Sequence, residues 1–228
     1  MVQYTALIVE PRKHNALVFV LENFTRLLDE RWSFVVCHGT DNEAFVQEKI
    51  QQKLSHASHR TTLVNLHVSN LTTLEYNALL TKPQFYELIP TEHVLFFQTD
   101  SMICEKHKLN IYDFFKYDYV GAPWVVDQDV GNCGLSLRRK SKMLEVLTHC
   151  DVSLDINEDY YFSVYCHPKV TLYKPTFEEA KKFSVETVYS DESFGIHNAW
   201  KYLSYEQIES LNERCSGLNE LIIMQGEQ

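Results

Sequence analysis

The residue with the clearest potential for chemistry is Asp100, which follows the apolar run Val94–Phe97 through Gln98 and Thr99. A short apolar run bounded by polar residues is typical of a strand buried on both faces of a parallel sheet. Ligands of open α/β sheets bind at the carboxyl ends of the strands, so Asp100 is expected to face a ligand or a metal ion. Because aspartate is also a common turn residue, the alternative is an Asp that only closes a core strand.

Three earlier strands are expected beside this one, at Thr5–Val9, Ser33–Cys37 and Thr61–Val68. Helical periodicity separates them, and the helical stretches are expected at residues 17–28, 40–54, 74–80 and 84–88. The alternation predicts an α/β fold whose first half is Rossmann-like, with parallel strands joined by right-handed crossovers. It contains neither GxGxxG after the first strand nor GxxxxGK[ST], which disfavours a dinucleotide dehydrogenase and a P-loop enzyme.

The second half is less regular. We expect a short strand or turn at Tyr119–Trp124, a segment of small residues at Val130–Leu137 and a helix at Lys142–His149. A further strand is expected at Val170–Tyr173. The final helix is expected from Ser204 to about Cys215, where Ser204 and Gln207 have the spacing of a capping box. No linker or internal repeat divides the 228 residues, so one domain, 1–228, is expected.

Composition excludes several classes of partner. The formal net charge of −10 leaves no basic face for a nucleic acid duplex, although a nucleotide ligand is compatible with it. The six cysteines form no CxxC pair and no zinc-like spacing, and Cys37 fits a buried thiol, so we expect a reducing compartment. Without a signal-peptide pattern or an 18-residue apolar run, the chain is expected to be soluble and cytoplasmic, with no integral membrane segment.

Several segments together resemble glycosyltransferases of the GT-A type, and more closely a family of uncharacterised proteins with that predicted fold. The segments are ALIVEPRKH, HGTDN, FFQTDS, DYVGAPW, GNCGLSLRRKSKMLE, NEDYYFS and GIHNAW, and their order and spacing carry the resemblance. It implies a GT-A-like fold with a mixed central sheet. Residues of about 1–104 would form the nucleotide-binding half, and residues of about 105–228 a smaller acceptor and catalytic half.

The resemblance implies a divalent metal, Mn²⁺ or Mg²⁺, that bridges the diphosphate of a nucleoside-diphosphate sugar donor. In GT-A enzymes a DxD motif ends the fourth strand and its last carboxylate binds the metal, whose hard charge suits oxygen ligands. Here the motif is Gln98-Thr99-Asp100, so Asp100 is the expected ligand and Gln98 is left to bond a ribose or a metal-bound water. His197 in GIHNAW is expected to complete the metal shell. A literal DxD at 127–129 follows no strand and is expected to be a solvated acidic turn.

The catalytic base is expected in Asn157-Glu158-Asp159, because inverting GT-A enzymes place a carboxylate at such a motif to take the proton of the attacking hydroxyl. Asp159 is the expected base, and Glu158 either orients the acceptor or is the base itself. Both acids would also suit the first turn of a helix, where the macrodipole favours negative charge.

Other residues are expected around the donor. Asn132 and Gly134, in a GNGG-like stretch where Cys133 replaces the usual Gly, would face sugar hydroxyls, and Trp124 would be either a stacking platform for a sugar or a core residue. Two further groups of residues would surround the nucleobase and ribose. The first follows the first two strands, with a surface-loop role as the alternative, and consists of Glu10, Arg12, His14, His38, Asp41 and Asn42. The second consists of Tyr76 and Asn77 on the helix before the fourth strand, with Gln98 and Thr99 at the end of that strand.

The expected activity is a metal-dependent transfer of a sugar, of the hexosyl type, to an unknown acceptor hydroxyl, with inversion if Asp159 is the base. A nucleotidyltransferase is one alternative, although its glycine-rich basic loop after the first strand is missing from EPRKHNA. A non-catalytic module that binds nucleotide sugar or carbohydrate is the other, and the missing first Asp of DxD supports it.

Overall fold

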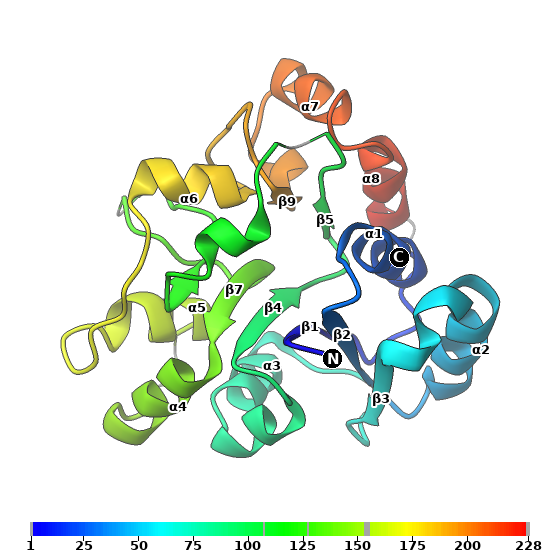
Figure 1. Ribbon diagram of the computed structural model, residues 1–228, viewed down its shortest axis with the longest axis horizontal. Helices are drawn as coiled ribbons and strands as arrows, with labels where there is room; N and C mark the ends of the chain where they lie inside the picture. The colour runs from blue at the N-terminus through cyan, green and yellow to red at the C-terminus, as the bar shows by residue number, and fades with distance from the viewer. Residues whose placement is uncertain (1, 107, 127, 153–155, 227–228) are drawn as a thin grey trace.

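The computed structural model describes residues 2–106, 108–126, 128–152 and 156–226. Within them a six-stranded sheet has the order β3-β2-β1-β4-β7-β6 (Figure 1). The first four of these strands are parallel, whereas β7 is antiparallel to both β4 and β6. Their bounds are β1 Tyr4–Val9, β2 Trp32–His38, β3 Thr61–Asn65, β4 His93–Phe97, β6 Tyr119–Val120 and β7 Leu135–Arg139. The mixed central sheet confirms the predicted fold class.

Helices cover both faces of this sheet. Helices α1, α2, α7 and α8 pack in one hydrophobic cluster, and α3 and α4 pack in the cluster on the opposite face (Figure 1). The α-helices are α1 Leu17–Leu27, α2 Glu43–Lys53, α3 Thr73–Leu80, α4 Lys140–His149, α5 Glu158–Tyr160, α6 Phe177–Phe183, α7 Tyr205–Asn212 and α8 Leu218–Gly226. Short 3₁₀ segments span Ser55–Arg60, Pro83–Leu88, Ile111–Phe114 and Ala199–Lys201, and a π-helical turn spans Tyr161–Tyr165.

The core follows the alternation of the central strands. In β1, Ala6 and Ile8 belong to the cluster under α1, whereas Leu7 and Val9 belong to the cluster under α3 and α4. Successive side chains of a strand point to opposite faces, so a strand that is apolar throughout must be covered on both sides. The apolar runs in the sequence therefore identified the four parallel strands, and their bounds agree with the prediction to within one residue, except that β3 ends at Asn65.

A second, three-stranded sheet brings distant segments to the end of β4. It consists of β5 (Ser101–Ile103), β9 (Gly195–His197) and β8 (Ser184–Val185), in the order β5-β9-β8. Because β5 is antiparallel to β9 with Ser101 opposite His197, this sheet places the segment after β4 beside a strand almost a hundred residues away.

Three local predictions were wrong. Val170–Tyr173 is not a strand; instead, the amide of Asp118 donates to the Tyr173 carbonyl at 2.7 Å and the Asp118 carboxylate accepts from the Tyr173 amide at 2.8 Å. The final helix ends at Asn212, although its Ser204–Gln207 capping box is formed, and α8 follows it unpredicted. The helix expected from residue 40 begins only at Glu43, after Asn42, whose side chain bonds the Gly39 amide and the Glu10 carbonyl.

The cysteines also depart from expectation. Disulfides join Cys104 to Cys215 and Cys150 to Cys166, whereas Cys37 is a free, buried thiol as predicted. Structural disulfides persist in oxidising environments, so this pairing does not fit the expected reducing compartment. The pairs lie 111 and 16 residues apart, and no local pattern indicates either pairing.

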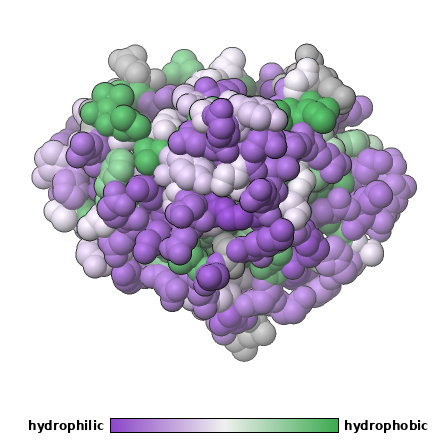
Figure 2. All heavy atoms as spheres, turned by 90° about the horizontal axis from the view of Figure 1, so that it is seen from above, coloured by the Kyte–Doolittle hydropathy of each residue, from purple (hydrophilic) through white to green (hydrophobic). Residues whose placement is uncertain are grey.

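The surface agrees with the composition. Figure 2 shows a face covered mostly by hydrophilic residues, on which hydrophobic residues form small separate groups. None of the helices in the described ranges has the length and apolar character needed to cross a membrane.

Candidate active site

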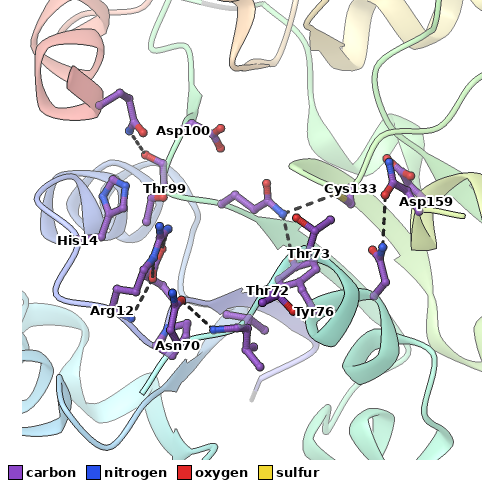
Figure 3. A pocket seen from close by; sticks show the side chains of 18 residues that line it. Arg12, His14, Asn70, Thr72, Thr73, Tyr76, Thr99, Asp100, Cys133 and Asp159 are labelled. Atoms are coloured by element: carbon purple, nitrogen blue, oxygen red, sulfur yellow. Dashed lines mark hydrogen bonds and ion pairs between the residues drawn. The ribbon is translucent and has the colours of Figure 1, made fainter. Parts of the chain in front are cut away.

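A cavity of about 460 Å³ opens at the carboxyl ends of β1 and β4 (Figure 3). In Figure 3, Cys133 and Asp159 lie on one side of it, Arg12 and His14 on the other, and Asp100 between them. Ten of the residues singled out in the sequence line this cavity: Glu10, Arg12, His14, Tyr76, Asn77, Gln98, Thr99, Asp100, Cys133 and Asp159. The predicted edge of the sheet is therefore where the chain gathers polar groups.

Asp100 and His197 meet at this edge because β5 pairs with β9. The amide of Asn198 donates to the Asp100 carbonyl at 2.8 Å, and His197 Nε2 lies 3.3 Å from Asp100 Oδ1. Burial by itself would raise the pKa of the Asp100 carboxyl group, but the neighbouring charge of His197 lowers that pKa. Asp100 lines the cavity itself, whereas His197 lies behind it.

The second nitrogen of His197 is bonded to Glu186, which the sequence analysis missed. Nδ1 lies 3.1 Å from Glu186 Oε1, and the same oxygen accepts a hydrogen bond from Asn132 Nδ2 at 2.8 Å. Burial lowers the pKa of His197, but the charges of Asp100 and Glu186 outweigh burial and raise that pKa to about 10. Glu186 directly follows the two-residue strand β8, where no sequence pattern marked it.

The donor set fits a divalent cation. Asp100 Oδ1 is buried and finds no hydrogen-bond donor in good geometry within the described ranges, and it adjoins an imidazole whose other nitrogen is held by a carboxylate. An imidazole held in this way is a common metal ligand. No group of three or more His, Cys, Asp or Glu side chains suited to a metal occurs among the described residues, so a cation here would need oxygens from a substrate or water as well.

Gly134 permits the close packing of His197. A Cβ atom at Gly134 would lie 2.0 Å from His197 Nε2, a distance that no side chain tolerates. The Gly134 carbonyl accepts a hydrogen bond from the amide of Gln98 at 3.0 Å. The expected sugar-facing role of Gly134 is therefore replaced by a packing role behind the cavity, which Gly134 does not line.

Asp159 has the environment of a general base. It lines the cavity, its exposed fraction is 9%, and its Oδ1 accepts a hydrogen bond from the Tyr160 amide at 2.8 Å. Burial has the largest effect on the pKa of Asp159 and the charge of Glu158 the second largest, and they raise this pKa to about 6. A carboxylate with such a pKa is largely ionised at neutral pH and is a stronger base than an ordinary aspartate.

Glu158 has a different environment from its neighbour. Its two oxygens accept hydrogen bonds from Arg138 Nη1 and Nη2 at 2.7 and 2.9 Å, and both side chains are almost completely buried. The guanidinium also lies 4.5 Å from the ring centroid of Phe96 and 4.7 Å from that of Tyr119. Glu158 does not line the cavity, so the structure supports a structural ion pair rather than the second catalytic role.

Gln98 stands where a GT-A motif has its first Asp. Its Nε2 donates to the Tyr76 hydroxyl at 3.1 Å and lies 3.6 Å from Cys133 Sγ. Tyr76 and Asn77 come from α3, which a complete capping box between Thr72 and Glu75 begins. Gln98 thus lines the cavity with a side chain that is already hydrogen-bonded.

The loop after β1 forms another wall. Arg12 makes a bidentate pair with the buried Glu10, with Nε–Oε1 and Nη2–Oε2 distances of 2.8 Å each. His14 accepts a hydrogen bond at Nδ1 from the Ala16 amide at 3.1 Å, and burial lowers its pKa. These side chains line the cavity, and the charge of Arg12 is already neutralised by Glu10.

The residues predicted after β2 lie outside the cavity. His38 Nδ1 donates to the Gly39 carbonyl at 2.8 Å. Asn42 Oδ1 accepts from the Gly39 amide, and its Nδ2 donates to the carbonyls of Glu10 and Arg12. Asp41 is exposed. Asn42 therefore joins the loops after β1 and β2, the His38 side chain bonds within the loop after β2, and none of the three lines the cavity.

The small-residue segment has mainly structural contacts. Asn132 has the left-handed φ of 72°, and its Oδ1 accepts a hydrogen bond from the Gly134 amide at 3.0 Å. With Nδ2 bonded to Glu186, both polar ends of the Asn132 side chain are engaged behind the cavity. Trp124 packs against Gly131, and its ring centroid lies 6.2 Å from that of Tyr160, outside the cavity lining.

The chain also brings residues to the cavity that no pattern indicated. Gln225 of α8 donates from Nε2 to the Thr99 carbonyl at 2.7 Å, and Asn157 accepts from Asn77 Nδ2 at 3.3 Å. Asn70 lines the cavity as well. Of the literal DxD, Asp127 lies outside the described residues, and the Asp129 carboxylate pairs with Lys174.

Comparisons with known proteins agree with this architecture. The model of the family described as "Protein of unknown function (DUF5672)" matches residues 60–197. No curated protein matches the chain. Solved structures with which it shares the GT-A fold include the following three glycosyltransferases.

The bifunctional glycosyltransferase WbbM, in its apo form, is 11% identical with a TM-score of 0.53, and the match covers 99% of this chain and 52% of that chain. The apo form of GlyE from Streptococcus pneumoniae TIGR4 is 12% identical with a TM-score of 0.54, over 99% of this chain and 64% of that chain. The mannosyltransferase PcManGT from Pyrobaculum calidifontis, solved with GDP-Man and Mn²⁺, is 12% identical with a TM-score of 0.50, over 76% and 54%. The chain thus spans between half and two thirds of the length of these proteins.

Proposed function

The chain belongs to the DUF5672 family of proteins of unknown function, and from this premise and its GT-A fold we propose that it transfers a sugar from a nucleoside-diphosphate donor to an acceptor hydroxyl. One observation carries the proposal. A single cavity at the carboxyl ends of the parallel strands exposes both Asp100, beside His197, and Asp159, whose pKa is raised to about 6. The first is suited to the charge of a diphosphate site and the second to removal of a hydroxyl proton.

The charges of the cavity favour a divalent cation in the reaction. Glu10, Asp100 and Asp159 line the wall, and the Arg12 guanidinium is already paired with Glu10, so a diphosphate would meet a wall of net negative charge. Asp100 and His197 would hold Mn²⁺ or Mg²⁺, which when bound offsets the charge that develops on the leaving diphosphate. The complex of PcManGT with GDP-Man and Mn²⁺ supports this class of donor and metal.

Asp159 acts on the acceptor in this proposal. Its Oδ1 is fixed by the Tyr160 amide, so the carboxylate is oriented before the acceptor arrives, and it takes the proton of the attacking hydroxyl group. A base that activates an external hydroxyl in a single displacement leads to inversion at the anomeric carbon. The donor nucleotide would lie between the loop after β1 and α3, where Arg12, Tyr76 and Asn77 line the cavity.

A thermal-shift screen of nucleoside-diphosphate sugars with Mn²⁺, Mg²⁺ or EDTA tests the proposal. A ligand present at a hundred times its Kd stabilises the folded state by about 2.7 kcal/mol, which raises the midpoint by several degrees. We expect such a shift with one nucleotide class, its loss in EDTA and in Asp100→Ala, and its retention in the control Asp191→Ala, which removes an exposed carboxylate far from the cavity wall.

The other outcomes are equally informative. Absence of a shift with every donor in the wild-type protein would contradict the proposed site. A shift that is independent of metal and of Asp100 would retain nucleotide binding and exclude the proposed metal ligands. Tight, metal-dependent binding without turnover would instead identify a binding module.

A further inference from the structure

Glu186 is a buried carboxylate that, among the described residues, has side-chain hydrogen bonds to the proposed metal ligand His197 and to Asn132. Its exposed fraction is 6%, and Oε1 lies 3.1 Å from His197 Nδ1 and 2.8 Å from Asn132 Nδ2. Burying a carboxylate is unfavourable unless it is paired and hydrogen-bonded, so these two contacts are the ones that retain it there.

Two hydrogen bonds and a left-handed backbone conformation fix the position of Asn132. Its Oδ1 accepts from the Gly134 amide at 3.0 Å, its carbonyl accepts from the Tyr119 hydroxyl at 2.9 Å, and its backbone has a φ of 72°. The amide group that donates to Glu186 is therefore held by the segment that leads into β7. Glu186 in turn has a defined place even though it follows a strand of only two residues.

The imidazole of His197 is enclosed between Glu186 and Gly134. Glu186 bonds Nδ1 on one edge, and the Gly134 backbone lies so close to Nε2 that a Cβ atom there would be 2.0 Å away. With Nδ1 donating to a carboxylate, the nitrogen that remains for a metal is Nε2, and this nitrogen is the one that faces Asp100 at 3.3 Å.

We propose that Glu186 is the positioning residue of the site: it accepts the Nδ1 proton of His197 and fixes the ring so that Nε2 is presented, with Asp100, to a divalent cation. Carboxylates that hold metal-bound imidazoles commonly raise the basicity of the ligand as well as orient it. The inference rests on the proposed function for the identity of the cation. The contact between Glu186 and the His197 ring does not depend on the proposed function.

The test titrates the full chain with Mn²⁺ in the presence of a nucleoside diphosphate. EPR measures the amounts of free and bound Mn²⁺. Loss of such a supporting carboxylate typically weakens metal binding about 10–100-fold, and we expect that loss in Glu186→Ala. Glu186→Gln keeps an oxygen that can accept the Nδ1 proton, so it should recover part of the affinity. Glu192→Ala, which removes an exposed carboxylate six residues later, should bind Mn²⁺ as the wild type does.

A second measurement reads the ring directly in the metal-free protein. The Nδ1–H of His197, hydrogen-bonded to Glu186, should give a downfield proton resonance, distinct from that of the Nε2–H which faces Asp100, that disappears in His197→Gln and in Glu186→Ala but persists in Glu192→Ala. Unchanged Mn²⁺ affinity in a folded Glu186→Ala protein would overturn the inference, and so would persistence of that resonance. If the wild type itself binds no Mn²⁺, the proposed metal site fails, and the resonance alone decides the role of Glu186.

Discussion

Asp159→Asn is expected to lower kcat for sugar transfer about 10²–10⁴-fold, the usual contribution of a general base. Asn keeps the shape of the side chain and can still accept the Tyr160 amide at its oxygen, but it cannot take a proton from the acceptor. The measurement is the initial rate with the donor that the thermal-shift screen identifies. Donor binding should remain within a few-fold of the wild type, because Asp159 acts on the acceptor. A variant that transfers sugar at the wild-type rate would contradict the assignment of the base.

The pH profile provides an independent check of the same residue. Asp159 must be ionised to act, and burial raises its pKa to about 6, so kcat/KM should fall tenfold per pH unit below about pH 6 and level off above it. An ordinary aspartate, with a pKa near 3.9, would leave the rate flat over this range. The residual activity of Asp159→Asn should lack the inflection near pH 6. An inflection that survives in this variant would assign the titration to another group.

Glu158→Gln is expected to destabilise the fold by about 3–5 kcal/mol, the usual cost of removing one partner of a buried ion pair. Arg138 is completely buried and its two terminal nitrogens both donate to Glu158, so the substitution leaves a guanidinium without its counter-charge. The free energy of unfolding in urea measures this effect. Glu145→Gln, which breaks the exposed pair with Lys142, is the matched control and should cost less than about 1 kcal/mol.

The expected contrast between the neighbouring acids is sharp. Asp159→Asn should leave the fold stable and remove activity, whereas Glu158→Gln should act mainly on stability. A loss of less than about 1 kcal/mol in Glu158→Gln would show that Arg138 is compensated by other groups, such as the aromatic rings of Phe96 and Tyr119.

The parts of this structure that were predictable depend on local pattern. The four parallel strands are apolar runs that must be covered on both faces, and Asp100 is the acid that ends one of them, so its place at the cavity followed from its position in the chain. Asp159 was predicted from the motif Asn157-Glu158-Asp159, whose acidic pair starts α5. The function of this edge remains a proposal.

The parts that were missed depend on contacts between distant segments. Glu186 is paired with His197 across 11 residues and with Asn132 across 54 residues, and neither separation leaves a periodic pattern in the sequence. Gln225 enters the cavity from α8, whose Leu218 and Leu221 are buried but whose helical pattern is too short to stand out. His38 and Asn42 were assigned to the ligand because they follow a correctly predicted strand. Their side chains instead form hydrogen bonds with backbone carbonyls, that of Gly39 for His38 and that of Glu10 for Asn42.

The direction of β7 allows the length of the segment before it to change without moving the residues that follow β4. Leu135, which starts β7, pairs with Phe97, which ends β4, so the segment that leads into an antiparallel strand meets the segments that leave parallel ones. The register of β7 is set by residues 135–139 against β4, and it does not depend on how many residues lie between Val120 and Gly134. None of the described residues in 122–130 lines the cavity, so an insertion there would leave Asp100 and the loop after β1 in their positions. The length of this loop can therefore change with no compensating substitution in the sheet.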